Sequence, residues 1–452
     1  MKRFILFLIL FIIGSESFAF NIVYPKRTNI TINAKSTFFI GSSDKPLKIN
    51  GQNVPLHSTG AFAYVVPLKE GINKFSIQSE GQYQLFTINK PAIKYSTYPP
   101  SQFKQYQEGK AFYVTTENAP LRSTPIDAGI NRMAHLQRNI LLNIDGEKSG
   151  FYRVILENNK YGWIAKSNVK LCDNYTNDPA KILSIEENND NDFYRYTFHL
   201  NKMVPYEITE GETLTLKLFN TENGTYIKEF PIKSFLGNKK LVGYRGKYIG
   251  SDFVWEIRKP SSINSKKPLK NLNIAIDPGH GGSEYGAIGC LGDKEKDIVL
   301  DIAKNLEKEL TKRGANVIMT RTDDTYLGLK ERVDITNYSD ASVFISIHAN
   351  ALPDGADPNK NSGTSVYYYY DQAKTLAGNI LASMITELSL NNDKVRQASF
   401  AVVRNTNALS VLVETAYLIN PEDNSKLISQ DFRKNCAKAI ADGVENYFKS
   451  DM

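Results

Sequence analysis

Hydrophobic and polar positions alternate with a period of two through most of the first 258 residues. Turn signals separate the short apolar segments, and Asn50-Gly51 is a pair that favours a hairpin turn with two positive φ angles. No amphipathic helical period is found in residues 20–98. The pattern therefore predicts three small all-β modules. They cover residues 20–98, with strands at 37–40, 61–66, 72–77 and 82–88, then 110–171, and then 172–258, with strands at 193–200, 213–219 and 240–244.

Two polar stretches differ from these modules in composition. Residues 95–109 are rich in Pro, Ser, Gln and Tyr, and residues 259–270 are dominated by Pro, Ser and Lys. Both compositions are typical of linkers. We expect the second stretch to be a flexible tether to the last domain.

From Asn271 onward, apolar runs alternate with segments of helical period. Helices are expected near residues 295–313, near 372–388 and at the C-terminus. The first of these is followed by Gly314, a usual helix stop signal. This alternation predicts an α/β domain over 271–452, with a mostly parallel central sheet flanked by helices. The expected strands are 273–276, 316–319, 343–347, 364–370, 400–403 and 411–413.

The N-terminus resembles a secretory signal peptide over residues 1–19. Lys2 and Arg3 precede an apolar stretch, 4–13, and Ser17-Phe18-Ala19 supplies small residues before a cleavage point. An uncleaved membrane anchor is the alternative. No later stretch approaches the roughly 18 apolar residues of a membrane span. We expect export to the periplasm, the cell wall or the medium, without a stable transmembrane anchor.

Composition narrows the function. The 452 residues carry a net charge of +7, which fits work beside an anionic envelope polymer but equally a generic basic surface. An exported chain without a concentrated basic stripe is not expected to bind nucleic acid. The three cysteines, Cys172, Cys290 and Cys436, lack metal-ligand spacing, so any metal must use histidines and carboxylates.

Four polar side chains follow or face strand ends in the predicted α/β domain. His280 comes just after the first strand, His348 and Glu414 end later strands, and Glu295 opens the first helix. Functional sites of open α/β sheets gather at the carboxyl ends of the strands. We therefore expect these four groups to lie together.

Two imidazoles and one carboxylate form a known catalytic zinc set that leaves a position open for water. Zinc lowers the pKa of that water, and a second carboxylate, for which Glu414 is free, can move protons. Taken singly, a strand-end histidine is more often structural, and Gly281-Gly282 fits a simple tight turn. Asp277 and Asn350 are candidates to orient the imidazoles, or to cap local structure.

Ordered blocks in this domain resemble the zinc-dependent N-acetylmuramoyl-L-alanine amidases. The first block, at residues 274–300, contains Asp-Pro-Gly-His-Gly-Gly and a Glu-Lys-Asp helix start. The later blocks are VIMTRTDD (317–324), LKERVDITN (329–337), FISIHANA (344–351), GTSVYYY (363–369) and VLVETAYLINPED (411–423).

This resemblance implies one zinc ion held by His280, Glu295 and His348, with Glu414 as the catalytic acid/base. The implied reaction is hydrolysis of the amide between N-acetylmuramic acid and L-alanine in peptidoglycan. Some relatives carry a helix between the equivalents of His348 and Glu414 that blocks the metal. That interval is short here, so we expect a site open without an activator. Cys290 departs from the pattern and could disturb metal loading on oxidation.

Weaker resemblances concern the β modules. Residues 20–98 resemble the immunoglobulin-like modules of surface enzymes, and 172–258 resembles a wall-targeting domain. Residues 110–171 are similar to bacterial Src-homology-3-type barrels, through Leu121-Arg122-Ser123 and Gly162-Trp163-Ile164. This implies wall-peptide binding by the module, but for Trp163 itself the favoured interpretation is that it fills the barrel core. We expect a monomer. A zinc peptidase cutting within the stem peptide and an inactive wall-binding protein are the alternative functions.

Overall fold

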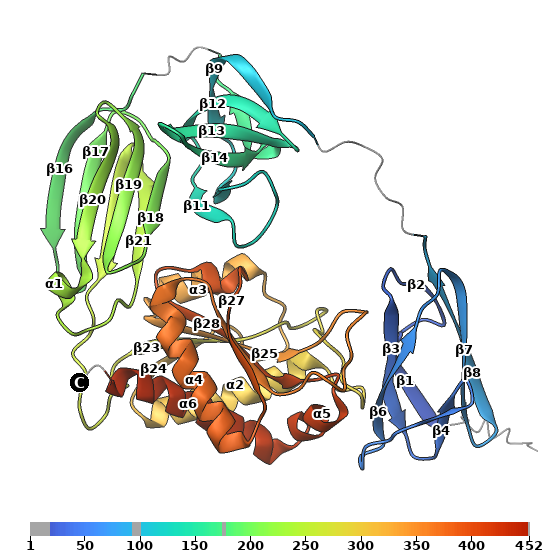
Figure 1. Cartoon of the computed structure of the whole chain (residues 1–452). Helices are drawn as coiled ribbons and strands as arrows, with labels where there is room; N and C mark the ends of the chain where they lie inside the picture. The colour runs from blue at the N-terminus through green and yellow to red at the C-terminus, as the bar shows by residue number, and fades with distance from the viewer. Residues whose placement is uncertain (1–18, 93–100, 174–177, 451–452) are drawn as a thin grey trace, which may run out of the picture.

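The computed structural model describes residues 19–92, 101–173 and 178–450 (Figure 1). The predicted signal peptide, except for Ala19, lies outside the described residues. Within the described ranges, no helix is long and apolar enough to cross a membrane.

The N-terminal module consists of two sheets packed face to face. Its eight strands are β1 (Phe20–Tyr24), β2 (Asn29–Thr31), β3 (Ser36–Ser43), β4 (Leu47–Ile49), β5 (Gln52–Val54), β6 (Ala61–Pro67), β7 (Gly71–Ser79) and β8 (Gln82–Lys90). One sheet has the order β1-β3-β6 and the other β2-β8-β7-β4-β5. Asn50 and Gly51 join β4 to β5 with φ angles of 49° and 79°, so the expected hairpin turn is confirmed. Phe39, Phe62 and Phe86 fill the space between the sheets.

The second module is a seven-stranded sheet with the order β11-β10-β14-β13-β12-β9-β15. Its strands are β9 (Lys104–Val114), β10 (Ala119–Arg122), β11 (Arg132–Leu136), β12 (Leu141–Lys148), β13 (Phe151–Glu157), β14 (Lys160–Ala165) and β15 (Val169–Leu171). Residues 104–109, which we expected in a linker, are part of β9 because that strand continues along β12.

Trp163 does not fill the core of this sheet. Alternation along β14 buries Gly162 and Ile164 and leaves the indole half-buried, with its ring edge-to-face against Phe103 at 6.0 Å. Arg153 lies over the Phe103 ring at 3.9 Å. The core reading of Trp163 was therefore wrong, and the indole belongs to an aromatic and cationic surface.

The third module is a sandwich of sheets β16-β17-β22-β21 and β18-β19-β20. Its elements are β16 (Ile182–Asn189), β17 (Phe193–Leu200), β18 (Tyr206–Thr209), β19 (Thr213–Thr221), β20 (Gly224–Pro231), α1 (Ile232–Leu236), β21 (Tyr244–Ile249) and β22 (Asp252–Arg258). The strand expected at 240–244 begins only at Tyr244. One continuous apolar core runs through the second and third modules.

The segment 259–270 is not a free tether. The backbone N–H of Lys259 donates to the carbonyl of Asp192, and the side chain of Leu269 is fully buried in the core of the last domain. The composition of the segment resembles a linker, but an apolar residue at its end anchors it.

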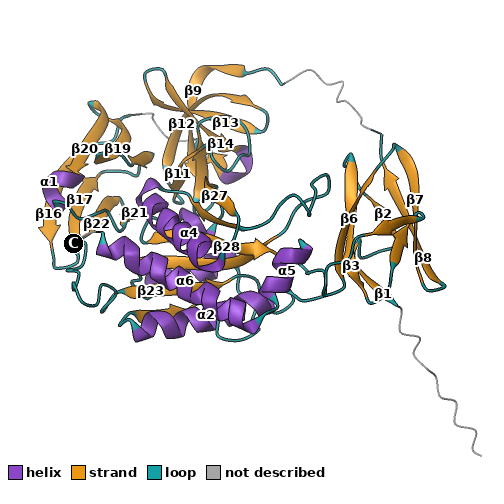
Figure 2. Ribbon diagram, turned by 60° about the horizontal axis from the view of Figure 1, so that its bottom comes forward, coloured by secondary structure: helices purple, strands orange, loops and turns teal. Residues whose placement is uncertain are grey.

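The last domain has a six-stranded sheet with the order β24-β23-β25-β28-β26-β27, in which only the β26–β28 pair is antiparallel. Helices α2 (Glu295–Lys312), α4 (Lys374–Leu388) and α6 (Gln430–Lys449) share the main core on one face of the sheet (Figure 2). The other face packs on a smaller cluster that includes Val402 and Val403. The strands are β23 (Asn273–Pro278), β24 (Asn316–Met319), β25 (Val343–Asn350), β26 (Thr364–Tyr368), β27 (Asn392–Gln397) and β28 (Leu409–Tyr417). The helices are α2 (Glu295–Lys312), α3 (Leu329–Tyr338), α4 (Lys374–Leu388), α5 (Pro421–Leu427) and α6 (Gln430–Lys449).

One predicted strand of this domain was wrong. Residues 402–404 form a 3-10 turn, and the edge strand is β27, whose sequence NDKVRQ is almost entirely polar. An edge strand with one exposed side does not need an apolar run. Hydrophobicity therefore indicated the wrong segment.

The β modules contact opposite ends of the parallel strands (Figure 1). The third module lies at the amino ends, where Arg258 donates to Asp340 at 2.7 Å, just before β25. The N-terminal module lies at the carboxyl ends, where the Tyr24 hydroxyl donates to Asp354, just after β25. The end of the sheet that carries the candidate site therefore faces the N-terminal module.

Candidate active site

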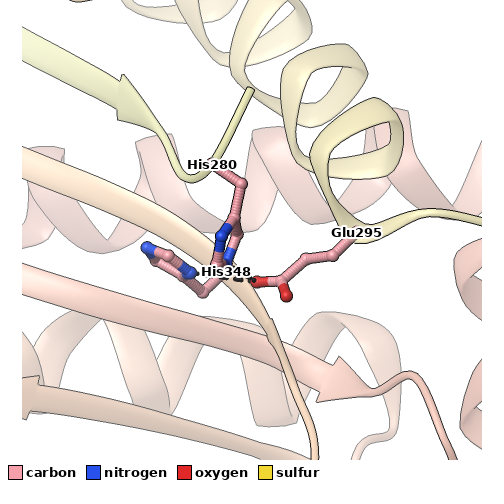
Figure 3. Close-up of side chains that lie close together, drawn as sticks. All are labelled: His280, Glu295 and His348. Carbon is pink, nitrogen blue, oxygen red and sulfur yellow. Dashed lines mark hydrogen bonds and ion pairs between the residues drawn. The ribbon is translucent and has the colours of Figure 1, made fainter. Parts of the chain in front are cut away.

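Parallel strands bring the four predicted groups to one edge of the sheet. His280 lies in the turn after β23, His348 is within β25, and Glu414 is its register partner on β28. Glu295 is the first residue of α2 and points back toward the two imidazoles (Figure 3).

Glu295 lies between the two histidines. Its Oε1 is 3.1 Å from His280 Nε2 and 2.9 Å from His348 Nδ1, and the two imidazole centroids are 4.9 Å apart. One ligand atom from each of the three residues falls within 4.8 Å of the others. Both imidazole side chains stay partly exposed, at 24% and 19%, while Glu295 is buried. This set of donors can hold a metal ion and leave it accessible from solution.

Backbone groups fix the Glu295 carboxylate. Its Oε2 accepts from the N–H of Ala287 at 2.8 Å, and its Oε1 accepts from the N–H of Ala349 at 3.1 Å. Burial alone would raise the pKa of Glu295, but hydrogen bonds from His280 and His348 hold it well below its usual range. Burial alone would lower the pKa of His348, but Glu295 raises it to about 9. Glu295 is thus an anion that attracts positive charge to this point.

Two glycines leave the space in which these side chains lie. A Cβ on Gly279 would come within 2.2 Å of the His348 ring. A Cβ on Gly286 would come within 2.3 Å of Glu295 Oε2 and 2.7 Å of His280, and its φ of 70° also favours glycine. The glycines of this loop therefore allow close packing around the three donors.

Two buried arginines hold the turn that carries His280. Arg321 donates to the carbonyls of Pro278 and Gly279, both at distances of 2.8–2.9 Å. Arg332 donates to the carbonyls of Pro278 at 2.8 Å and His280 at 2.7 Å. Sequence reasoning missed both residues. They stand in two of the blocks that resemble the amidase family, which was the available signal.

Asp277 does not orient an imidazole. Its carboxylate accepts from Arg332 at 2.7 Å, from Thr320 at 2.6 Å and from Ser346 at 2.7 Å, and is almost fully buried. It pairs with the arginine that holds the turn, so its action on His280 passes through the backbone. Asn350, the other candidate, lies at the end of β25 opposite Tyr417.

Cys290 lies too deep to act as a surface redox site. The thiol is fully buried, 3.4 Å from the carbonyl of Ile419, and burial raises its pKa to about 12. A protonated, buried thiol is unreactive. Within the described ranges, Cys172, Cys290 and Cys436 are all free.

Glu414 stands beside the three donors with an unused oxygen. Its Oε2 is buried and has no hydrogen-bond partner among the described residues. Burial raises the pKa of Glu414 to about 7, against the opposing charge of His348. An unpaired buried carboxylate oxygen costs free energy unless a further group binds it. Glu414 therefore fits a proton carrier for a molecule that enters beside the metal donors.

The interval between His348 and Glu414 contains one α-helix in the part of the chain that the structure describes. This helix, α4, buries Leu376, Ile380 and Met384 in the main core together with α6. The apolar face of α4 is therefore packed in the core on the sheet.

These features define the class of protein: a hydrolase built on an α/β domain, with a His–Glu–His donor set at the carboxyl end of its sheet. The sequence profile of the N-acetylmuramoyl-L-alanine amidases matches residues 274–446. The chain belongs to this family, and it is a peptidoglycan amidase.

Individual relatives cover different shares of the chain. The probable cell wall amidase LytH of Staphylococcus epidermidis is 36% identical over 226 residues, which are 47% of this chain and 75% of that protein. LytH of Staphylococcus aureus is 39% identical over 191 residues, which are 42% of this chain and 62% of that protein.

Among solved structures, the amidase AmiC2 of Nostoc punctiforme is 35% identical. The match covers 41% of this chain and 98% of that one, with a TM-score of 0.38. An amidase of Clostridium difficile 630 is 33% identical over 40% of this chain and 98% of its own, also with a TM-score of 0.38.

Proposed function

We propose that the amidase reaction takes place at a zinc centre held by His280, Glu295 and His348, with Glu414 as the acid/base. The observation that carries this proposal is the convergence of the three donors within 4.8 Å, beside a buried carboxylate oxygen that has no partner among the described residues. Zinc suits two imidazoles and one carboxylate, and when bound it polarises a carbonyl and lowers the pKa of water.

The chain's own residues account for the proton transfers. Glu414, with a pKa raised to about 7 by burial, takes a proton from the attacking water and delivers it to the leaving amine of L-alanine. Glu295 stays ionised because the imidazoles hold its pKa low. The two carboxylates thus differ in role because their surroundings move their pKa values in opposite directions.

In this proposal, the upstream β modules hold the enzyme at the cell wall. We assign residues 20–98 to an immunoglobulin-like module, 110–171 to a Src-homology-3-type barrel, 172–258 to a wall-targeting module and 271–452 to the catalytic domain. The half-buried Trp163, with Phe103 and Arg153 beside it, supports wall-peptide binding by the barrel. The exported protein would meet peptidoglycan in the periplasm or at the cell wall.

The active site is proposed to be open without an activator. The partial exposure of the His280 and His348 side chains supports this.

Metal analysis of full-length protein tests the zinc centre. We expect one zinc ion per chain in the wild type and loss of most of it in His348→Ala. Removing zinc with a chelator should abolish wall hydrolysis, and adding zinc back should restore it. His199→Ala is the control, because His199 lies on β17 of the third module, away from the proposed zinc centre. Equal zinc content in His348→Ala and wild type would contradict the assignment.

A further inference from the structure

The N-terminal module packs on the loops that surround the proposed zinc centre. Its sheet β1-β3-β6 shares an apolar cluster with the loop before Glu295, the loop after β25 and the end of β28. The buried members are Phe38, Ile40, Ala61 and Ala63 of the module and Cys290 and Ile419 of the catalytic domain. Leu352, in the loop after β25, is partly buried and packs against them. Each of these loops is joined directly to a residue of the site.

The polar centre of this interface is Asp354, in the loop that follows His348. The Tyr24 hydroxyl lies 2.8 Å and 2.7 Å from its two carboxylate oxygens, and the Thr37 hydroxyl donates at 2.5 Å. Thr37 is fully buried. Hydrogen bonds to an ionised acceptor are among the stronger ones, and they depend on geometry. The contact therefore fixes where this loop lies, beyond what apolar packing alone would fix.

Elsewhere along this interface, the N-terminal module and the catalytic domain are in contact but leave a recess between them. Asn359 donates to the carbonyl of Ala63 at 3.0 Å, and His57 lies 3.2 Å from Glu422. Between these contacts is a recess of about 380 Å³, lined by residues of both domains that include His57, Tyr64, Asp357 and Pro421. Its volume is within the range of small-molecule sites, and it has both aromatic and polar walls.

We infer that the N-terminal module forms part of the substrate-binding edge, with Tyr24, Thr37 and Asp354 as positioning residues for the loop after His348. A glycan strand with attached peptides extends on both sides of the bond that is cut. At this end of the sheet, it meets the positioned loop and the module. The contact thus determines affinity for polymeric wall, while the bond-breaking groups stay in place. This inference rests on the proposed function.

The variant Tyr24→Phe/Thr37→Val tests the inference in the full chain, because it removes two hydroxyls and keeps the shape of both side chains. We expect faster hydrogen exchange of backbone amides in residues 351–363. We also expect KM for purified wall to rise about tenfold, with kcat changing less than twofold. Asp354→Asn should raise KM, and combining it with the double variant should add little, because all three changes remove one contact.

Tyr83→Phe is the matched control, because Tyr83 lies on the other sheet of the same module and is 68% exposed. Unchanged exchange in the loop, unchanged KM, or a fall in kcat at constant KM would each overturn the inference. Failure of the proposed function has a different signature, namely a wild-type protein whose wall hydrolysis does not depend on zinc.

Discussion

At the scale of single residues, the sequence was enough to find the side chains that converge at the proposed zinc centre, because their position at strand ends is a local property. His280, His348 and Glu414 each follow an apolar run, and Glu295 opens a helix. The arginines that hold the turn could not be found in this way. Arg321 and Arg332 act on backbone carbonyls of residues far away in the chain, and only the folded arrangement shows this.

Glu414→Gln separates proton transfer from metal binding. The amide keeps the size of the side chain but cannot take up a proton, so kcat should fall by about 10²–10⁴-fold. Zinc content should stay that of the wild type, because Glu414 is outside the donor set. Parallel kinetics and metal analysis check both expectations. A kcat near the wild-type value would falsify the assigned role.

Arg332→Met tests the clamp on the His280 turn. The change leaves the buried carboxylate of Asp277 without its cation, takes the arginine donor from the carbonyl of His280, and leaves the carbonyl of Pro278 with Arg321 alone. Breaking a buried pair in this way costs about 3–5 kcal/mol of the free energy of unfolding. Denaturant titration measures the loss. Lys330→Met on the same helix is the control, since its side chain is 74% exposed; equal stability of the two variants would contradict the clamp.

At the scale of elements, segments with a strong hydrophobic period were predicted correctly as helices or strands. A strand made of polar residues gave no pattern from which it could be predicted. The helices α2, α4 and α6 and five of the six strands of the last domain coincide with predicted segments, because each buries an apolar face in the common core. The edge strand β27 was missed since its residues are mostly exposed and polar. Residues 259–270 were expected to form a flexible tether because they are mostly polar. One buried leucine, Leu269, instead anchors this segment to the core of the last domain.

Gly286→Ala tests the space that the loop before α2 leaves for the donors. The added methyl group would lie within 2.3 Å of Glu295 Oε2, so the carboxylate must move away from the imidazoles. We expect weaker zinc binding, measured by competition with a chelator, and a lower kcat/KM. Gly292→Ala is a useful control, since it has a similar positive φ of 89° but nothing near its Cβ. Equal zinc affinity in both variants would contradict this packing argument.

At the scale of the whole molecule, composition predicted separate β modules, but the way they pack was not predictable. The second and third modules share one core, and the N-terminal module lies against the catalytic edge. These contacts join residues hundreds of positions apart and leave no periodic signal. The function could thus be predicted from a local sequence pattern, whereas the packing of the modules against one another is seen only in the folded chain.

One module contact predicts how stability depends on pH. Glu210 of the third module accepts from the backbone N–H of Gln372 at 2.9 Å, and burial raises its pKa to about 7. The folded protein then holds a proton that the unfolded chain releases near pH 4.5, so this residue makes stability fall as pH rises from about 4.5 to 7. Above pH 7 the buried charge costs at most about 3 kcal/mol.

Glu210→Gln should therefore stabilise the protein at pH 8 and change little at pH 4.5. The difference should appear in the free energy of unfolding measured at both pH values. Glu212→Gln is the comparison, because its side chain lies in the same loop and is exposed. A loss of stability at pH 8 in Glu210→Gln would show that the carboxylate is needed in its ionised form.

The most direct test of the account is mass analysis of peptidoglycan fragments after digestion with zinc-loaded enzyme. The proposed zinc mechanism predicts intact stem peptides with a free amino-terminal L-alanine and glycan strands without peptide. Chelator should abolish these products, and Glu414→Gln should slow their release by about 10²–10⁴-fold. Cuts within the stem peptide, or release of the same products without zinc, would contradict it.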